Sequence, residues 1–307
     1  MQNKSTIISA LKYAVPYIKL YKGKVFVIKT GGELFNSPSL IKKLIEQIGI
    51  FHQFGIKVIL IHGGGKQLTK MATSLGIETK FIEGRRVTDA DSIDVATMVM
   101  NGQINTKILA TARDLEIPAI GMSGVDAGLI CAHRRKIMKS KDNKSIDYGF
   151  VGDIDSVNTD FLEKQLEAGL IPVISPLTCD KDGVILNINA DTVAASIAVE
   201  LNAEKLILVT SVPGILEKKN DPSTLISYLN RDNLMKMKDN ERLSDGMLPK
   251  AEAIEHALKE GVSRVHIISY HTPDSLLIEV FTNDGTGTLV VNDVAALSSL
   301  EQSGEEL

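Results

Sequence analysis

Two short segments each place an apolar strand directly before a glycine-rich turn. Lys24 to Glu33 reads KVFVIKTGGE, and Lys57 to Lys66 reads KVILIHGGGK. Glycine lets backbone N–H groups approach an anion closely, and a helix that follows such a turn adds a favourable dipole. Because Lys29 ends the first strand beside Gly31 and Gly32, the two turns predict a cradle for a phosphoryl group in transfer.

Two further segments carry polar groups where a helix is expected to begin. Asn187, Asn189 and Asp191 alternate along NINAD, so their side chains point the same way. One of them can cap the helix, but three polar side chains on one side exceed what a cap requires. Lys250 falls in the first turn after SDGMLP, where a cation opposes the helix dipole. An anionic ligand explains that lysine better than helix stability does.

Weaker signals come from two other segments. The run EGRRVT offers Arg85 and Arg86, whose planar forks suit a carboxylate, although a surface pair is the alternative. The run TSVPGIL, from Thr210 to Leu216, ends another strand in a turn suited to an adenine or ribose. His62 is interpreted as a strand-end side chain and not as a catalyst.

Common nucleotide motifs are absent from the chain. Gly65-Lys66 is followed by Gln67, so no G-x-x-x-x-G-K-[ST] loop occurs, and no G-x-G-x-x-G follows a strand. The phosphate binder must therefore have a different construction.

Composition narrows the class of protein. The 307 residues include 34 basic and 38 acidic ones, which gives no electrostatic case for a nucleic-acid partner. No apolar run approaches the roughly 18 residues of a membrane span, and the first twenty residues lack a signal-peptide pattern. Two cysteines, Cys131 and Cys179, form no zinc motif and suggest a reducing compartment. We expect a cytoplasmic protein without a membrane partner.

The elements that must position these residues alternate between strand and helix. Six short apolar runs are typical of fully buried strands: Val25–Ile28, Val58–Ile61, Ala119–Met122, Pro172–Ile174, Leu206–Val209 and Val265–Ile268. Helical patterns lie between them: 40–51 behind Ser37-Pro38, then 190–201 and 249–259. This alternation predicts an α/β fold, a three-layer αβα sandwich around a mostly parallel central sheet.

The N-terminus departs from that alternation. Ile7, Ile8, Leu11, Val15 and Ile18 share one face at helical spacing, and Pro16 is expected to kink the segment. The apolar face of such a helix is expected to pack against another apolar surface. Packing on its own domain and docking on another subunit are both open.

Taken together, the chain resembles the amino acid kinase family, within it the branch acting on acylated glutamate, over roughly residues 22–291. The matching segments in chain order are VIKTGG, IHGGG, RRVTD, IGMSGVDAG, GFVGDIDSVN, IPVISPL, NINADT, AEKLILVTSVPGIL, SDGMLPKAEA and LLIEVFTNDGTGT. The resemblance implies the amino acid kinase fold with three parts: residues 1–22 as an N-terminal helix, a candidate for oligomerisation; 23–202 as a lobe for the acylated amino acid and the phosphoryl group; and 203–307 as a lobe for ATP.

The activity implied by the resemblance is transfer of a phosphoryl group from ATP to the side-chain carboxylate of N-acetyl-L-glutamate, the second step of arginine biosynthesis. Lys29 and Lys250 would neutralise the phosphoryl group, and Asp191 would hold both lysines. Mg²⁺ would be bound through the phosphates, with no protein metal site. The binding residues implied are Gly31, Gly32 and Gly64 for the phosphoryl group, Gly64, Gly65, Arg86 and Asn187 for the acylated amino acid, and Ser211, Gly214, Leu216 and Ser244 for the nucleotide.

Such chemistry suits the residues present. A carboxylate is already a competent nucleophile at neutral pH, so no general base is needed. Catalysis can rest on alignment and charge stabilisation. The chain departs from the usual family pattern, which often has tyrosine at Thr30, asparagine at Glu33, proline at Lys66 and aspartate at Ser211.

The N-terminal segment resembles the extension of arginine-inhibited members, which join dimers into hexamers through it. Residues 275–288 match their effector region, with Glu279 and Gly287 as candidates for binding L-arginine. The resemblance therefore implies feedback inhibition and a homo-oligomer, either a dimer or a trimer of dimers. Two alternatives stay open: a kinase of N-succinylglutamate or an acylated aminoadipate, and a non-catalytic amino-acid sensor on the same fold.

Overall fold

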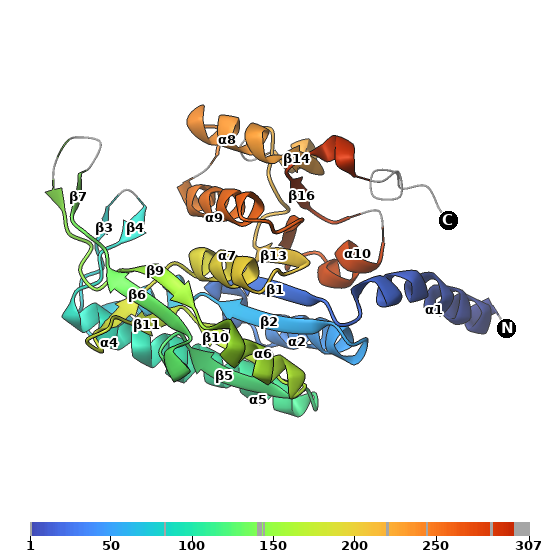
Figure 1. The fold of residues 1–307 in the computed structure, drawn as a ribbon, viewed down its shortest axis with the longest axis horizontal. Coiled ribbons are helices and arrows are strands. Elements are labelled where there is room, and N and C mark those ends of the chain that lie inside the picture. The colour runs from blue at the N-terminus through green and yellow to red at the C-terminus, as the bar shows by residue number, and fades with distance from the viewer. Residues whose placement is uncertain are drawn as a thin grey trace.

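The computed structural model describes residues 2–82, 84–139, 143, 145–218, 221–243, 245–282 and 285–297 of the chain. Its centre is an eight-stranded sheet in the order β14-β16-β15-β13-β1-β2-β10-β5 (Figure 1). Every neighbouring pair is parallel except β15 with β16. The six expected strands are all in this sheet: β1 (Val25–Thr30), β2 (Lys57–His62), β5 (Ala119–Ser123), β10 (Ile171–Ser175), β13 (Lys205–Thr210) and β15 (Val265–Ser269).

Helices cover both faces of the sheet, because consecutive strand residues point to opposite sides. Val27 belongs to one apolar cluster, whereas Phe26 and Ile28 belong to the other. The first cluster also holds residues of α6 (Thr159–Glu167), α7 (Ala190–Glu200), α8 (Arg231–Asp239) and α9 (Leu248–Lys259). The second holds residues of α2 (Pro38–Gln53), α3 (Gly65–Ser74), α4 (Ala90–Thr97), α5 (Thr106–Asp114) and α10 (Ser275–Phe281). The predicted αβα sandwich is confirmed.

Helix starts follow the sequence signals closely. Pro38 and Pro249 each lie in the first turn of their helix, where a missing N–H is harmless. Asn189 caps α7, since its Oδ1 accepts from the N–H groups of Asp191 and Thr192. The cap therefore uses one of the three polar residues of this segment and leaves Asn187 and Asp191 for other contacts.

A second sheet was not foreseen. Its order is β12-β11-β6-β9, from β12 (Ile185–Asn187), β11 (Leu177–Cys179), β6 (Ile130–Arg134) and β9 (Gly152–Val157). These strands are short, and β9 reads GDIDSV, so they lack the apolar runs that marked the central strands. The remaining strands are β3 (Phe81–Ile82), β4 (Arg85–Arg86), β7 (Met138–Lys139), β8 (Ser145–Ile146), β14 (Tyr228–Asn230) and β16 (Thr288–Val291).

The N-terminal helix α1 (Gln2–Tyr21) continues through Pro16 and extends away from the body of the molecule (Figure 1). Near its end, Tyr17 and Ile18 pack against the second apolar cluster. Farther out, Ile8 is 53 % exposed and Val15 is 42 % exposed. Of the stripe residues whose side chains are described, Ile18 thus packs on its own domain, whereas Ile8 and Val15 are exposed. The side chains of Ile7 and Leu11 lie outside the described part.

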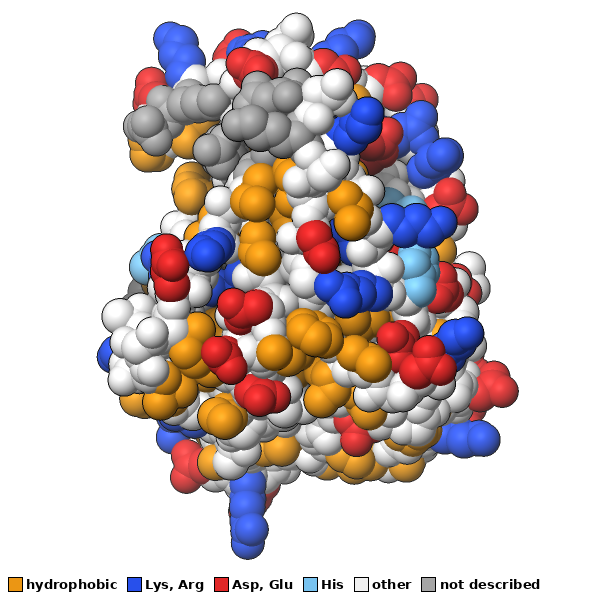
Figure 2. Space-filling model, turned by 90° about the vertical axis from the view of Figure 1, so that its left-hand side faces the viewer, with side chains coloured by type: hydrophobic (Ala, Val, Ile, Leu, Met, Phe, Trp, Pro, Cys, Tyr) orange, Lys and Arg blue, Asp and Glu red, His pale blue; other side chains and the backbone are white. Residues whose placement is uncertain are grey.

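The central sheet is continuous from the strands before residue 202 to those after it, as expected. The boundaries 1–22, 23–202 and 203–307 stay predictions. Figure 2 shows acidic and basic side chains interspersed with hydrophobic ones over the described residues of one face. None of the helices in the described part of the chain combines the length and the apolar character that a membrane span requires.

Candidate active site

The two glycine-rich turns meet at one edge of the sheet. Strands β1 and β2 are parallel neighbours, with Thr30 beside His62, so their carboxyl ends deliver both turns to the same place. A side-chain carbon built on Gly32 would lie 2.8 Å from the Cα of Gly64. Gln67 donates a short hydrogen bond to the carbonyl of Gly32. The backbones therefore pack against each other as only glycine allows, and α3 begins there.

Asp191 joins two lysines that lie far apart in the chain. Its Oδ1 lies 2.9 Å from Nζ of Lys29, and its Oδ2 lies 3.5 Å from Nζ of Lys250. The side chains of Lys29 and Asp191 are only 6 % and 5 % exposed. Lys29 comes from the end of β1, Asp191 from the first turn of α7, and Lys250 from the first turn of α9. Packing of α7 against α9 over the sheet brings the three charges together.

Burial and neighbouring charges shift the pKa values of Lys29 and Asp191. Burial lowers the pKa of Lys29, and the nearby charge of Lys250 lowers it further, while Asp191 acts in the opposite direction. Burial alone would raise the pKa of Asp191, but the two ammonium groups hold it below its ordinary value. Oδ1 of Asp191 and Nζ of Lys29 form a buried ion pair. Two lysines and one acid give the cluster a formal net positive charge, which favours an anion.

A cavity of about 350 Å³ opens in front of this cluster. Its lining is Lys29, Gly31, Gly32, Glu33, Gly65, Lys66, Val209, Thr210, Ser211, Val212, Gly246, Met247, Lys250 and Tyr270. Six of them were predicted from the sequence as site residues: Lys29, Gly31, Gly32, Gly65, Ser211 and Lys250. Tyr270 was missed, although it directly follows β15 at the same edge of the sheet. Glu33 and Lys66 were noted only as departures from the family pattern.

Gly214 and Leu216, also suggested for the nucleotide, are not among the residues that line this cavity. A side-chain carbon on Gly214 would lie 2.5 Å from Oγ1 of Thr288. Close packing therefore accounts for this glycine. Leu216 forms an isolated bridge with Leu225. Ser244 lies outside the described residues.

The residues suggested for the acylated amino acid lie beside the glycine turns. Nη2 of Arg86 donates to the carbonyl of Gly65 at 3.0 Å and to Oγ1 of Thr69 at 2.7 Å. Burial lowers the pKa of the Arg86 guanidinium below its ordinary value. Gly64 is not among the residues that line the cavity, and a side-chain carbon on it would lie 2.8 Å from Cδ1 of Ile104. Arg86 is thus tied to the first turn of α3.

Asn187 has an unused acceptor. Its Nδ2 approaches Oγ1 of Thr88 at 3.5 Å, while its Oδ1 is buried without a hydrogen-bond partner in the described part of the chain. An unsatisfied buried oxygen is costly, so it points to a group donated by a ligand. The N–H of an acylated amino acid is a donor of the required kind.

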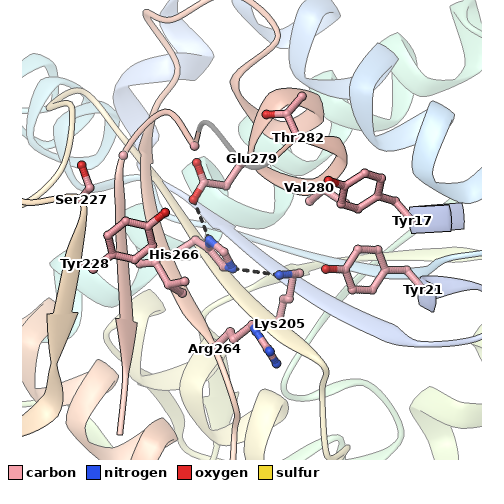
Figure 3. Close-up of a pocket in the computed structure, with 13 residues that line it drawn as sticks. Tyr17, Tyr21, Lys205, Ser227, Tyr228, Arg264, His266, Glu279, Val280 and Thr282 are labelled. Atoms are coloured by element: carbon pink, nitrogen blue, oxygen red, sulfur yellow. Dashed lines mark hydrogen bonds and ion pairs between the residues drawn. The ribbon is translucent and has the colours of Figure 1, made fainter. Parts of the chain in front are cut away.

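The two effector candidates line a second cavity between α1 and the end of the sheet. Figure 3 shows Glu279, His266 and Lys205 in a row, with Tyr17 and Tyr21 of α1 beside them. Nδ1 of His266 lies 2.7 Å from Oε1 of Glu279. Its Nε2 lies 3.1 Å from Nζ of Lys205. Gly287 also lines this cavity, and a side-chain carbon on it would lie 1.9 Å from the carbonyl oxygen of Ile267.

The sequence of this chain is similar to those of known proteins. Residues 24–269 match the sequence model described as "Amino acid kinase family". The acetylglutamate kinase of Myxococcus xanthus is 43 % identical over 292 residues, covering 94 % of this chain and 95 % of its own. The acetylglutamate kinase of Archaeoglobus fulgidus is 41 % identical and covers 94 % and 99 %.

A solved structure shares the fold. N-acetylglutamate synthase from Neisseria gonorrhoeae, complexed with coenzyme A and N-acetyl-glutamate, superposes with a TM-score of 0.82 at 28 % identity. The match covers 94 % of this chain and 64 % of the synthase, so the chain spans less than two thirds of that protein. The same synthase with coenzyme A and L-arginine gives a TM-score of 0.80 at 27 % identity. The family match over most of the sequence, together with relatives above 40 % identity, shows that this chain is an enzyme and belongs to the amino acid kinase family.

Proposed function

We propose that the protein transfers the γ-phosphoryl group of ATP to the side-chain carboxylate of N-acetyl-L-glutamate, giving N-acetylglutamyl phosphate. The observation that supports this most is the convergence of Lys29 and Lys250 on Asp191 at the glycine turns. Similarity to acetylglutamate kinases over 94 % of the chain supports the choice of acceptor. This reaction would be the second step of arginine biosynthesis.

In this mechanism the substrate carboxylate attacks the γ-phosphorus, and the bond to the leaving oxygen of ADP breaks. The attacking carboxylate is already ionised, so the site needs no general base. Lys29 and Lys250 would neutralise charge on the transferring oxygens, and the N–H groups of Gly32 and Gly64 would donate to them. Asp191 would touch neither substrate but would fix both ammonium groups.

The acceptor would lie between the glycine turns and β12. Arg86, fixed beside Gly65, would bind a carboxylate of the amino acid. The unpaired Oδ1 of Asn187 would accept the amide N–H of the acyl group. Free glutamate carries an ammonium group instead of that amide, so these contacts favour an acylated substrate.

Ser211 and the cavity wall next to it would hold the nucleotide. Mg²⁺ would be bound through the phosphates of ATP and would neutralise part of their charge.

A hydroxamate assay for acyl phosphate tests the reaction. Purified protein with ATP, Mg²⁺ and N-acetyl-L-glutamate is expected to give product, and free L-glutamate is expected to give much less. N-succinylglutamate and an acylated aminoadipate in parallel identify the acyl acceptor. If turnover is faster with either of these acids, that acid and not N-acetylglutamate is the substrate.

We further propose inhibition by L-arginine at the second cavity and assembly through α1 in the cytoplasm. Buried Glu279 would pair with the guanidinium group, and Tyr17 and Tyr21 would couple the ligand to α1. The exposed apolar residues Ile8 and Val15 would contact another subunit. Removal of residues 1–20 should reduce particle mass by light scattering and weaken the arginine response. Unchanged mass and response would contradict this proposal.

A further inference from the structure

Two departures from the family pattern are partners in one ion pair. Glu33 and Lys66 come from different turns, but Nζ of Lys66 lies 2.5 Å from Oε1 of Glu33. Glu33 belongs to the short 3₁₀ segment Gly32–Asn36, and Lys66 belongs to the first turn of α3. Both residues line the main cavity, together with Lys29 and Lys250.

Glu33 also reaches across the cavity. Its Oε2 lies 3.5 Å from the hydroxyl of Tyr270, which follows β15. Among the described residues that line the cavity, Glu33 is the single acid and faces three lysines. A polyphosphate that enters this space must therefore meet Glu33 as well as the cations.

The stability of the fold alone does not explain why a lysine stands at position 66. Its side chain is 69 % exposed and that of Glu33 is 39 % exposed, and ion pairs with this exposure contribute little to folding. Lys66 also stands at the N-terminal end of a ten-residue helix, where the dipole disfavours a cation. An anion at this end of α3 would reverse that penalty.

Lys66 is nevertheless suited to bind phosphate. The hydrogen bond with Glu33 raises the pKa of Lys66, so the ammonium group remains charged at neutral pH. Lysine places a compact charge on a flexible four-carbon stem, and the exposed side chain has room to swing. Its only described ionic partner, Glu33, holds it on the cavity wall without burying it.

We propose that Lys66 is a third phosphate-binding cation. Its ammonium group pairs with Glu33 until ATP enters and then pairs with an oxygen of the terminal phosphate. Glu33 keeps the lysine at the cavity and competes with the nucleotide for it. The pair therefore tunes the affinity for ATP without taking part in the chemical step. This inference rests on the proposed use of ATP but not on the identity of the acceptor.

The test is calorimetric titration of the full-length protein with ATP, ADP and adenosine. Lys66→Met should raise the Kd for ATP about tenfold, as expected for one charge-assisted hydrogen bond, and should raise the Kd for ADP less. Adenosine binding should not change. Lys66→Arg should recover most of the ATP affinity, because it restores a cation at the same place.

The second variant separates this role from a structural one. Glu33→Gln breaks the same ion pair, but it should leave ATP binding unchanged or tighter, because Lys66 is released to the phosphate. If the pair only braced the cavity, both variants would weaken ATP and adenosine binding alike. Lys42→Met is the matched control: Lys42 is an exposed lysine paired with Asp114, so its loss changes net charge equally away from the cavity.

An unchanged Kd for ATP in Lys66→Met, or an equal change for adenosine, would overturn the inference. Failure of the proposed function gives a different result. In that case ATP binding would respond to Lys66 as expected, while the hydroxamate assay would detect no product with N-acetyl-L-glutamate.

Discussion

The carboxylate of Asp191 contacts the ammonium group of Lys29 at 2.9 Å, with 5 % and 6 % of these side chains exposed. Burial lowers the pKa of Lys29, and the charge of Asp191 opposes that shift. Through its second oxygen it also faces Lys250. One acid thus contacts both lysines and raises the pKa of Lys29.

Asp191→Asn should remove this support while keeping the shape of the side chain. Breaking a buried ion pair from one side costs about 3–5 kcal/mol, so the free energy of unfolding in urea should fall by that order. Asp153→Asn is the control, because Asp153 pairs with Arg135 but is 41 % exposed. That change should cost less than about 1 kcal/mol.

The same variant should alter the pH dependence of turnover. The pKa of Lys29 is already lowered, and Asp191 is the group that raises it. Activity should decline as pH rises through the folded pKa of Lys29, and Asp191→Asn should move this alkaline decline to lower pH. The pKa of Asp191 is lower in the folded protein than in the unfolded chain. The stability that results is present at pH values above the unfolded pKa and is lost as the pH falls through the folded pKa. An alkaline decline at the same pH in both proteins would contradict the role given to Asp191.

His62 should make the fold sensitive to mild acid. Burial lowers the pKa of His62 from 6.5 to about 4, and Nδ2 of Asn105 lies 3.2 Å from its Nε2. The unfolded chain binds a proton at this residue more readily, so stability should fall by about 3 kcal/mol as pH drops from 6.5 to 4. Urea titrations at several pH values measure this slope. His62→Gln should flatten it, and an equal slope would show that His62 is not responsible.

Gly32→Ala tests the packing of the two turns. The added carbon would lie 2.8 Å from the Cα of Gly64, which forces the turns apart and displaces their N–H groups. Loss of one such donor typically lowers turnover by about a hundredfold or more, so kcat should fall on that scale. Gly102→Ala is the control, because an added carbon there meets nothing within 4 Å. Wild-type kcat in Gly32→Ala would mean that this close approach does not matter.

Glu279→Gln should separate inhibition from catalysis. Glu279 lines the second cavity and takes no part in the main one, so turnover without arginine should remain near normal. The concentration of L-arginine for half inhibition should rise about tenfold or more, as expected for a lost charge-assisted contact. Asp114→Asn, at an exposed acid paired with Lys42, provides the control. Unaltered inhibition in Glu279→Gln would place the effector elsewhere.

The sequence allowed prediction of the central sheet, because its buried strands are continuous apolar runs. Lys29 could be singled out because it ends a strand beside two glycines, and Lys250 because a cation is disfavoured at a helix start. Asp191 could be singled out because three polar side chains in its segment exceed what a helix cap requires. The second sheet was missed because strands such as β9 are polar. The π-helical stretch Met98–Asn105 was missed because no residue type marks it.

Glycines after a strand were the least specific sequence signals for a binding site. Gly32 permits two turns to meet at the cavity, whereas Gly214 makes room for Thr288, and the sequence pattern is alike in both cases. The pairing of Glu33 with Lys66 could not be inferred from either residue alone. Such pairs depend on which turns the sheet order brings side by side.

The most direct test is the single-turnover rate of acyl phosphate formation in Lys29→Met, Lys250→Met and the double variant, at saturating ATP and N-acetyl-L-glutamate. We expect each single change to slow the step by about a hundredfold or more with little change in nucleotide affinity, and the double variant to be far less than additive. A near-normal rate in either single variant would contradict the convergence of both lysines on the transferred phosphoryl group.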